Sequence, residues 1–216
     1  MHNIKSIIVF NGGSAGDFLK FICLSQIEQD ENAVSVLDNG RVVSANEYFK
    51  KICSLHYNKS RPDLDYSKIF PVENSHHLLP WFKQVSDQLY FIDYPDRCQR
   101  QIVDIYIAKA RRGNIEYVWH REIELGLLDN VHKSLQHKIS QENIVEVIKI
   151  NWKRNLRGWR TDTTLAPIQL SEFFDLEKFA EIVMNVSKLD KINMDLLKKQ
   201  HNNWTSKNQI LQGMFK

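Results

Sequence analysis

The sequence has few cysteines, and their spacing indicates neither a disulfide framework nor a metal site. Cys23, Cys53 and Cys98 are odd in number and far apart, and none belongs to a Cys-x-x-Cys or Cys/His ligand pattern. The histidines at 120, 132 and 137 do not have the spacing of metal ligands either. These absences predict no bound metal and a reduced, cytoplasmic setting.

Long apolar runs, low-complexity segments and internal repeats are also missing. No stretch approaches the roughly 18 to 20 apolar residues that span a bilayer, so we expect no membrane association. The first residues, Met-His-Asn-Ile-Lys, lead into an apolar strand rather than the pattern of a signal peptide. An excess of one charge is absent too, since the net charge is only +3 and the pI is about 8.6. This mildly basic balance suits an anionic ligand but does not demand nucleic acid.

What the sequence does contain is an alternation of strand-like and helix-like patterns. At 216 residues with 43% hydrophobic content, the chain is expected to form a single α/β domain over residues 1–216. Such alternation predicts a parallel sheet flanked by helices. The expected strands lie at 7–10, 33–37, 41–43, near 69, at 88–94, 143–150 and 168–170, and the expected helices at 17–29, from a cap at Ser44 onward, at 97–111, 172–187 and 190–204.

The most informative stretch joins the first strand to the first helix. Four apolar residues, Ile7 to Phe10, run into three glycines, Gly12, Gly13 and Gly16, before the helical pattern begins. Glycines permit tight turns and close backbone approach, and a helix start directs N–H groups and a positive dipole end at the loop. This arrangement predicts a bound phosphate or sulfate. The loop is neither a Walker A nor a GxGxxG motif, and a glycine-rich turn without a ligand stays open from the loop alone.

A second conspicuous stretch runs from Lys149 to Arg160. It holds five cations, two tryptophans and no acid, and we expect the polar part from Trp152 to Thr164 to be a loop. This composition suits phosphate contacts combined with base stacking, on a nucleotide or a nucleic acid. The alternative is a solvated loop with Trp152 in the core.

Three segments in this order resemble the sulfotransferase superfamily, particularly the small sulfotransferase-like proteins of bacteria and phages. They are the glycine/serine loop, the histidine segment His76 to Pro80, and the segment from Tyr90 to Arg100 with its proline turn. The region from Trp204 to Asn208 also looks like the family's Trp-x-x-x-Asn ending. The resemblance implies a three-layer, P-loop-like α/β fold and 3′-phosphoadenosine 5′-phosphosulfate (PAPS) as the sulfuryl donor.

The resemblance also implies roles for particular residues. In this reading His77 is the first candidate for the catalytic base and His76 the second, because the segment has one extra residue. The family's loop lysine is replaced by Gly13, and its 3′-phosphate arginine and serine by Asp93 and Gln101. Arg97 and Arg100 can take over that phosphate by charge-assisted hydrogen bonds. The expected donor-binding residues are Gly12, Gly13, Ser14, Ala15, Gly16, Asp17, Arg97, Arg100, Arg157 and Trp159.

Together these observations predict a sulfotransferase-like protein that moves a sulfuryl group from PAPS to an acceptor hydroxyl or amine. One alternative is a catalytically inactive nucleotide-binding scaffold, and another is a nucleic-acid-binding module that uses residues 149–160. A different P-loop phosphotransferase is disfavoured, because the lysine and Ser/Thr that handle a triphosphate and magnesium are missing. The acceptor and the oligomeric state are not encoded in any motif of the sequence.

Overall fold

The computed structural model describes residues 4–29, 46–56, 61–109 and 144–216. The chain divides into two compact units, the first formed by residues 1–93 and 164–216 and the second by residues 94–163. The expectation of one domain over residues 1–216 stays a prediction, and each unit is described by itself below.

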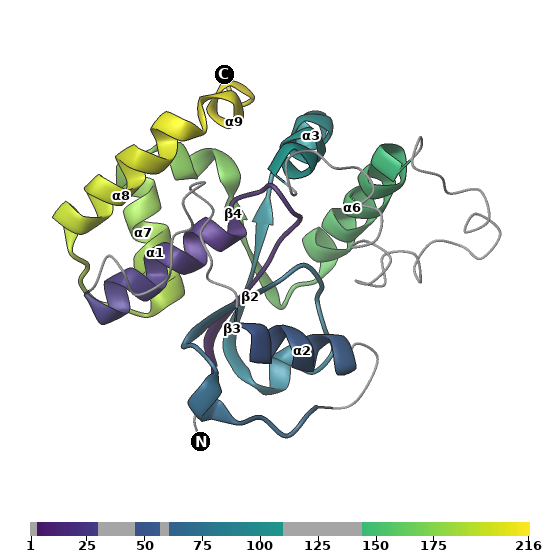
Figure 1. Cartoon of the computed structure of the whole chain (residues 1–216), viewed down its shortest axis with the longest axis vertical. Coiled ribbons are helices and arrows are strands. Elements are labelled where there is room, and N and C mark those ends of the chain that lie inside the picture. Colours follow the sequence, from purple (N-terminus) through teal and green to yellow (C-terminus); the bar gives the residue numbers. More distant parts are fainter. Residues whose placement is uncertain (1–3, 30–45, 57–60, 110–143) are drawn as a thin grey trace. The chain divides into compact units, whose positions relative to one another are not determined.

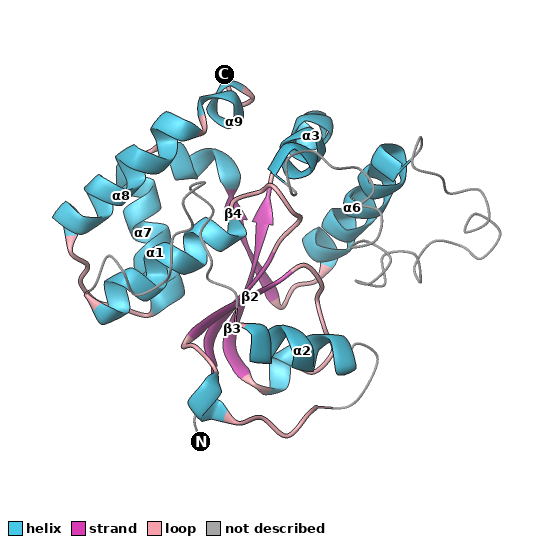
Figure 2. Ribbon diagram, viewed as in Figure 1, coloured by secondary structure: helices cyan, strands magenta, loops and turns pink. Residues whose placement is uncertain are grey.

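The first unit contains a sheet of four parallel strands in the order β2-β1-β3-β4 (Figures 1 and 2). The strands are β1 (Ile4–Val9), β2 (Val72–Ser75), β3 (Ser86–Asp93) and β4 (Leu165–Gln169). The prediction of an α/β fold with a parallel sheet flanked by helices is thereby confirmed.

The central strands β1 and β3 are buried because their sequences are apolar on both faces. Ile7, Ile8 and Val9 are fully buried, as is Ile92 in β3. Continuous apolar runs of this kind are typical of parallel strands with both faces covered. The register places Val9 beside Ser75 of β2 and beside Phe91 of β3, so the carboxyl ends of these three strands lie at one edge.

Helices α1 (Gly16–Glu28), α7 (Leu176–Ser187) and α8 (Met194–Lys207) of this unit pack together. Phe18 at the start of α1 joins them, because its ring stacks on Phe179 at 5.5 Å and on Trp204 at 4.4 Å between centroids. Ser6 of β1 ties α7 to the sheet by donating a hydrogen bond to the Val186 carbonyl (2.6 Å). The first unit also contains α2 (Glu47–Leu55), α9 (Gln209–Gly213) and the short 3₁₀ helices 66–68, 82–84 and 170–174.

The second unit contains a 3₁₀ turn (Asp96–Cys98) and the helices α3 (Gln99–Lys109) and α6 (Ile144–Thr161). Its core is aromatic and aliphatic, and the Tyr106 and Trp152 rings meet edge to face at 5.1 Å. Ile102 and Val103 of α3 are fully buried, as is Leu156 of α6.

Three expectations about these elements were wrong. Residues 144–150 of the expected strand and 152–161 of the expected loop belong instead to one helix, because α6 runs from Ile144 to Thr161. The helix α2 is capped by Asn46, whose side-chain oxygen accepts from the Phe49 N–H (3.1 Å), rather than by Ser44. Ser44 and the strands expected at 33–37 and 41–43 lie outside the described residues.

Candidate functional site

The loop between β1 and α1 has a backbone conformation that favours anions. Gly13 and Ala15 have positive φ values of 80° and 63°, whereas Ser14 between them does not. Such alternation is the conformation in which successive N–H groups form a concave nest. The first intrahelical bond runs from the Leu19 N–H to the Ala15 carbonyl (3.0 Å), so the N–H groups of residues 16 to 18 precede the helix's own bonding.

Ser14 and Gly16 hold this conformation from inside. The buried Ser14 hydroxyl donates to the Asn11 carbonyl (2.6 Å), and the Ser14 N–H bonds the same oxygen (3.2 Å). A Cβ at Gly16 would overlap the ring of Phe10. Glycine is therefore required at this position for close packing of the helix start against the last residues of β1. Ser14 was expected to bind the donor. In the structure its hydroxyl donates its hydrogen bond within the loop, to the Asn11 carbonyl.

Two histidines follow β2 beside this loop. The His76 ring lies 4.5 Å from the Phe10 ring between centroids, and its Nδ1 lies 3.2 Å from the Phe10 carbonyl oxygen. A carbonyl can only accept, so Nδ1 is the donor in this contact, and in the neutral ring Nε2 then holds the lone pair. His77 differs, because its backbone N–H donates to the Ser75 hydroxyl (3.1 Å) and its Nε2 is buried. The two rings therefore differ in which nitrogen is engaged or buried.

The strand order also indicates where a ligand is expected. From β1 the chain goes to β2 on one side and then to β3 on the other, so the carboxyl end of β1 and β3 is a topological switch point. Ligands of doubly wound sheets bind at such points. Asp93 ends β3 there, and its carboxylate accepts from the Gln169 side chain of β4 (3.3 Å). The glycine loop and Asp93 therefore border the same switch point.

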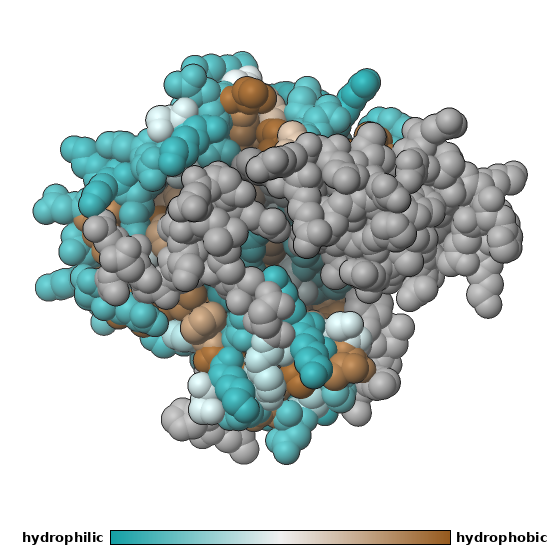
Figure 3. Space-filling model, viewed as in Figure 1, coloured by the Kyte–Doolittle hydropathy of each residue, from teal (hydrophilic) through white to brown (hydrophobic). Residues whose placement is uncertain are grey.

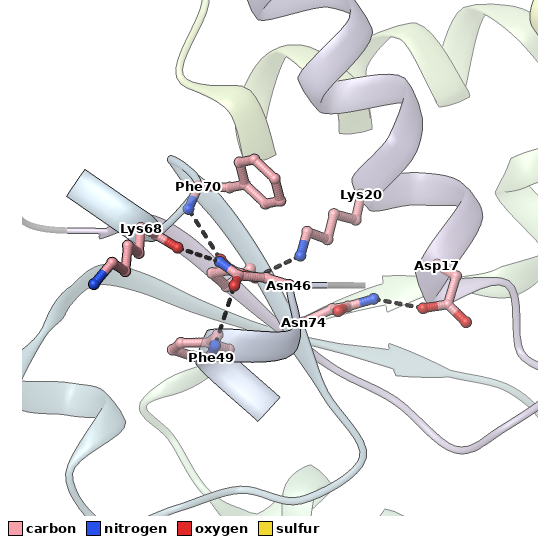
Figure 4. A network of polar contacts seen from close by, with 8 residues as sticks. Asp17, Lys20, Asn46, Phe49, Lys68, Phe70 and Asn74 are labelled. Carbon is pink, nitrogen blue, oxygen red and sulfur yellow. Dashed lines mark hydrogen bonds and ion pairs between the residues drawn. The ribbon is translucent and has the colours of Figure 1, made fainter. Parts of the chain in front are cut away.

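Lys20, on the second turn of α1, is the nearest lysine after the loop, but it is not available to a ligand. Its ammonium (Lys20 in Figure 4) pairs with the Glu73 carboxylate of β2 at 2.5 Å. Both side chains are fully buried. Glu73 also accepts from the Asn46 side chain (2.6 Å) and the Phe70 N–H (3.0 Å). Burial lowers the pKa of Lys20 and raises that of Glu73, while their mutual attraction opposes both shifts. Lys20 is therefore not a substitute for a lysine in the loop, where Gly13 stands.

Asp17 is the one acid in the first turn of α1. Its carboxylate accepts a hydrogen bond from the Asn74 side chain of β2 (2.9 Å), as Figure 4 shows. Its negative charge opposes an anion in the loop, although it suits the positive end of the helix dipole. The N-cap residue of α1 is Ala15, which makes no side-chain capping hydrogen bond.

The remaining predicted donor-binding residues lie in the second unit. Arg97 is in the 3₁₀ turn before α3, Arg100 is in α3, and Arg157 and Trp159 are in α6. Arg97, Arg100 and Arg157 are exposed, but the Trp159 ring is 4% exposed and faces the core of its unit. Trp159 therefore does not offer a face for stacking on a base, and Trp152 is equally buried.

The described parts of the chain contain no group of three or more His, Cys, Asp or Glu side chains that could hold a metal ion. None of their helices has the length and apolarity to cross a bilayer. Burial raises the pKa of the Cys23 and Cys53 thiols well above the usual range, which makes them poor nucleophiles. On the face seen in Figure 3, hydrophilic side chains dominate the described surface.

Comparison of the chain with models of known families, with curated proteins and with solved structures gave no match. The candidate site therefore rests on its own geometry.

Sequence reasoning missed the buried polar cluster of Lys20, Glu73 and Asn46. The one sign of it in the sequence is Glu73, an acid directly after Val72 at the start of β2. An acid at such a position is expected on the surface unless its partner is known. Gln169 was likewise missed as a partner of Asp93, because their pairing depends on the β3–β4 register.

Proposed function

We propose that the protein binds the phosphosulfate end of PAPS at residues 12–17 and transfers the sulfuryl group to an acceptor hydroxyl or amine. The observation that carries the proposal is the φ alternation at Gly13 and Ala15, where β1 enters α1 at the switch point of a parallel sheet. Backbone N–H groups in such a nest suit the oxygens of a phosphate or sulfate. The choice of a sulfonucleotide over other anions comes from the resemblance of the sequence.

His76 is the proposed base. With Nδ1–H bonded to the Phe10 carbonyl, Nε2 can take the proton of the acceptor hydroxyl or amine. The acceptor atom then forms a bond to sulfur as the bond between sulfur and the phosphate oxygen breaks. That electron pair leaves with the phosphate of 3′-phosphoadenosine 5′-phosphate. Loop N–H groups that hold the donor in line would lower the barrier by positioning and charge stabilisation.

One observation favours a second candidate, a nucleotide-binding scaffold without catalysis. The loop has no cation, since Gly13 stands where the family has lysine and Lys20 is sequestered by Glu73. Asp17 adds a negative charge at the helix start. Both features weaken stabilisation of a charged transition state more than they weaken binding through the backbone.

Isothermal titration of the full chain with 3′-phosphoadenosine 5′-phosphate, together with a transfer assay using PAPS and a panel of hydroxyl and amine acceptors, tests the proposal. We expect His76→Gln to keep donor affinity within about twofold, since the amide can donate to the Phe10 carbonyl, and to lower transfer by about 10² or more. His77→Gln is the matched control and should change transfer little.

The outcomes separate the candidates. Binding of the bisphosphate without transfer to any acceptor would favour the inactive scaffold. Absence of binding by both the bisphosphate and PAPS would overturn the proposal.

A further inference from the structure

The positive charge of this protein is concentrated in one helix of the second unit. Helix α6 carries five cationic side chains and one acid, a net charge of +4, whereas the whole chain has a net charge of +3. The rest of the chain is therefore slightly negative. Such a local excess creates a positive potential that the overall composition conceals.

Two of these cations make short contacts within their own unit. Arg160 donates to the Asp96 carboxylate (2.8 Å) and to the Tyr94 carbonyl (2.7 Å), and Lys149 pairs with Glu146 (3.1 Å). Arg160 and Lys149 therefore have partners within their own unit.

Lys153 and Arg157 belong to the outward face. At 100° per residue, the side chains of Ile150, Lys153, Arg154 and Arg157 fall within an arc of about 100°. Ile150 is 68% exposed and the Lys153 side chain 47%, and both arginines are exposed. Lys153 approaches Asp96 only to 4.0 Å. The outer face therefore carries three cations and one acid, Glu146, which lies one turn before Ile150 and is paired with Lys149. The buried Ile148, Trp152 and Leu156 lie on the opposite side.

Helix α6 also limits what kind of polyanion it suits. Both tryptophans of the basic stretch are 4% exposed, so the face offers guanidinium and ammonium groups without an aromatic surface for stacking bases. Single-strand binders combine cations with such stacking platforms. A duplex presents one phosphate charge per about 1.7 Å of its axis and hides its base faces.

We propose that the outer face of α6, formed by Ile150, Lys153, Arg154 and Arg157, binds the phosphate backbone of a nucleic-acid duplex without reading its sequence. The contacts go from flexible cationic side chains to phosphates, which position a protein on a duplex but do not specify bases. This site is independent of the proposed sulfuryl transfer in the first unit.

Fluorescence anisotropy of a labelled 20-base-pair duplex with the full chain tests the proposal at salt concentrations from 50 to 200 mM. Three phosphate contacts, one for each cation of the face, predict a slope of log K against log salt of about −3. Lys153→Gln/Arg157→Gln should weaken binding at 50 mM salt by about tenfold or more and reduce the slope by about 2. Two duplexes of different sequence should bind alike.

Lys178→Gln/Lys198→Gln is the matched control. It also removes two positive charges, but from exposed positions of α7 and α8 in the first unit. Its affinity for the duplex should stay within about twofold of that of the parent. Equal loss in both double variants would show that only net charge matters and would overturn the proposal. Tighter binding of a single strand of the same length, or binding of heparin or anionic vesicles but not the duplex, would overturn it as well. Circular dichroism of each variant excludes unfolding as the cause.

Discussion

The buried ion pair of Lys20 and Glu73 joins the second turn of α1, which follows the glycine loop, to β2. Both side chains are fully buried, and Glu73 accepts two further hydrogen bonds from Asn46 and the Phe70 N–H. The network is satisfied as a whole, so its members cannot be changed singly without leaving a buried charge unpaired. Its role in the site is to hold the start of α1 in place.

Glu73→Gln is expected to lower the free energy of unfolding by about 3 to 5 kcal/mol, because Lys20 is left buried without its counter-charge. The glutamine oxygen can still accept from Asn46 and the Phe70 N–H. Lys20→Met/Glu73→Gln should therefore regain at least about 1 kcal/mol of this loss. Urea unfolding of the parent, the two single variants and the double variant measures the coupling. Additive losses would show that the pair does not interact energetically.

Two glycines that lie in helices should respond to alanine in opposite ways. Gly158→Ala should stabilise the protein by about 0.5 to 1 kcal/mol, because its Cβ meets open space and alanine loses less backbone entropy. Gly16→Ala should destabilise it by about 1 to 3 kcal/mol, because the Cβ overlaps the Phe10 ring and forces β1 and α1 apart. Thermal unfolding of both variants checks the signs. A stabilised Gly16→Ala variant would mean that the loop is not held against Phe10.

At the scale of the element, the 3₁₀ turn Asp96–Cys98 is held to α6 by charge. The Arg160 guanidinium donates to the Asp96 carboxylate and lowers the pKa of that carboxyl from its ordinary value of about 3.8. A lowered folded-state pKa contributes stability above the unfolded value, and this contribution is lost as pH falls through the lower folded value. The Arg160 side chain is 33% exposed and that of Asp96 44%, so solvent screens the pair.

Asp96→Asn should therefore lower the free energy of unfolding by less than about 1 kcal/mol at pH 7. The difference in free energy of unfolding between the parent and the variant should shrink once the pH falls below 3.8. It should vanish as the pH passes below the folded-state pKa of Asp96. Urea unfolding of both proteins at pH 7, 4 and 2.5 measures the gap. A gap that persists at the lowest pH would assign the effect to the shape of the side chain instead of its charge.

The elements differ in how well the sequence predicts them. The first strand, the loop and α1 were predicted within a few residues, because an apolar run, glycines and a helical pattern follow each other with clear boundaries. Helix α6 was not, since Ile144 to Ile150 has β-branched residues on both alternating faces, as in a strand buried in a parallel sheet. The helical period appears only when Ile148, Trp152, Leu156 and Trp159 are read together, because these residues form one buried stripe.

At the scale of the whole molecule, the candidate site follows from topology more than from motifs. The glycine loop and the two histidines could be named from the sequence, but their proximity depends on β1 and β2 being neighbours in the sheet. The preference for His76 depends on a contact with the Phe10 carbonyl that no spacing reveals. Arg97, Arg100, Arg157 and Trp159 belong to the other unit, and Trp159 is turned inward by the helical period of α6.

The chain leaves the first unit after β3 and returns to it at β4, so the second unit is an insertion between two strands that pair directly. Each unit has its own buried core, and we expect them to open separately. Trp152→Ala removes a buried ring that meets Tyr106 and should cost the second unit about 3 to 5 kcal/mol.

Hydrogen exchange read by mass spectrometry should then show faster exchange in α3 and α6, while β1 and β3 keep their protection. Leu19→Ala is the matched control, because it opens a cavity beneath α1 in the first unit and should speed exchange there first. If either variant accelerates exchange uniformly along the chain, the two units unfold as one. Separate opening would mean that the cationic face of α6 can change its structure without disturbing the loop at residues 12–17, so that ligand binding at the two places can be measured independently.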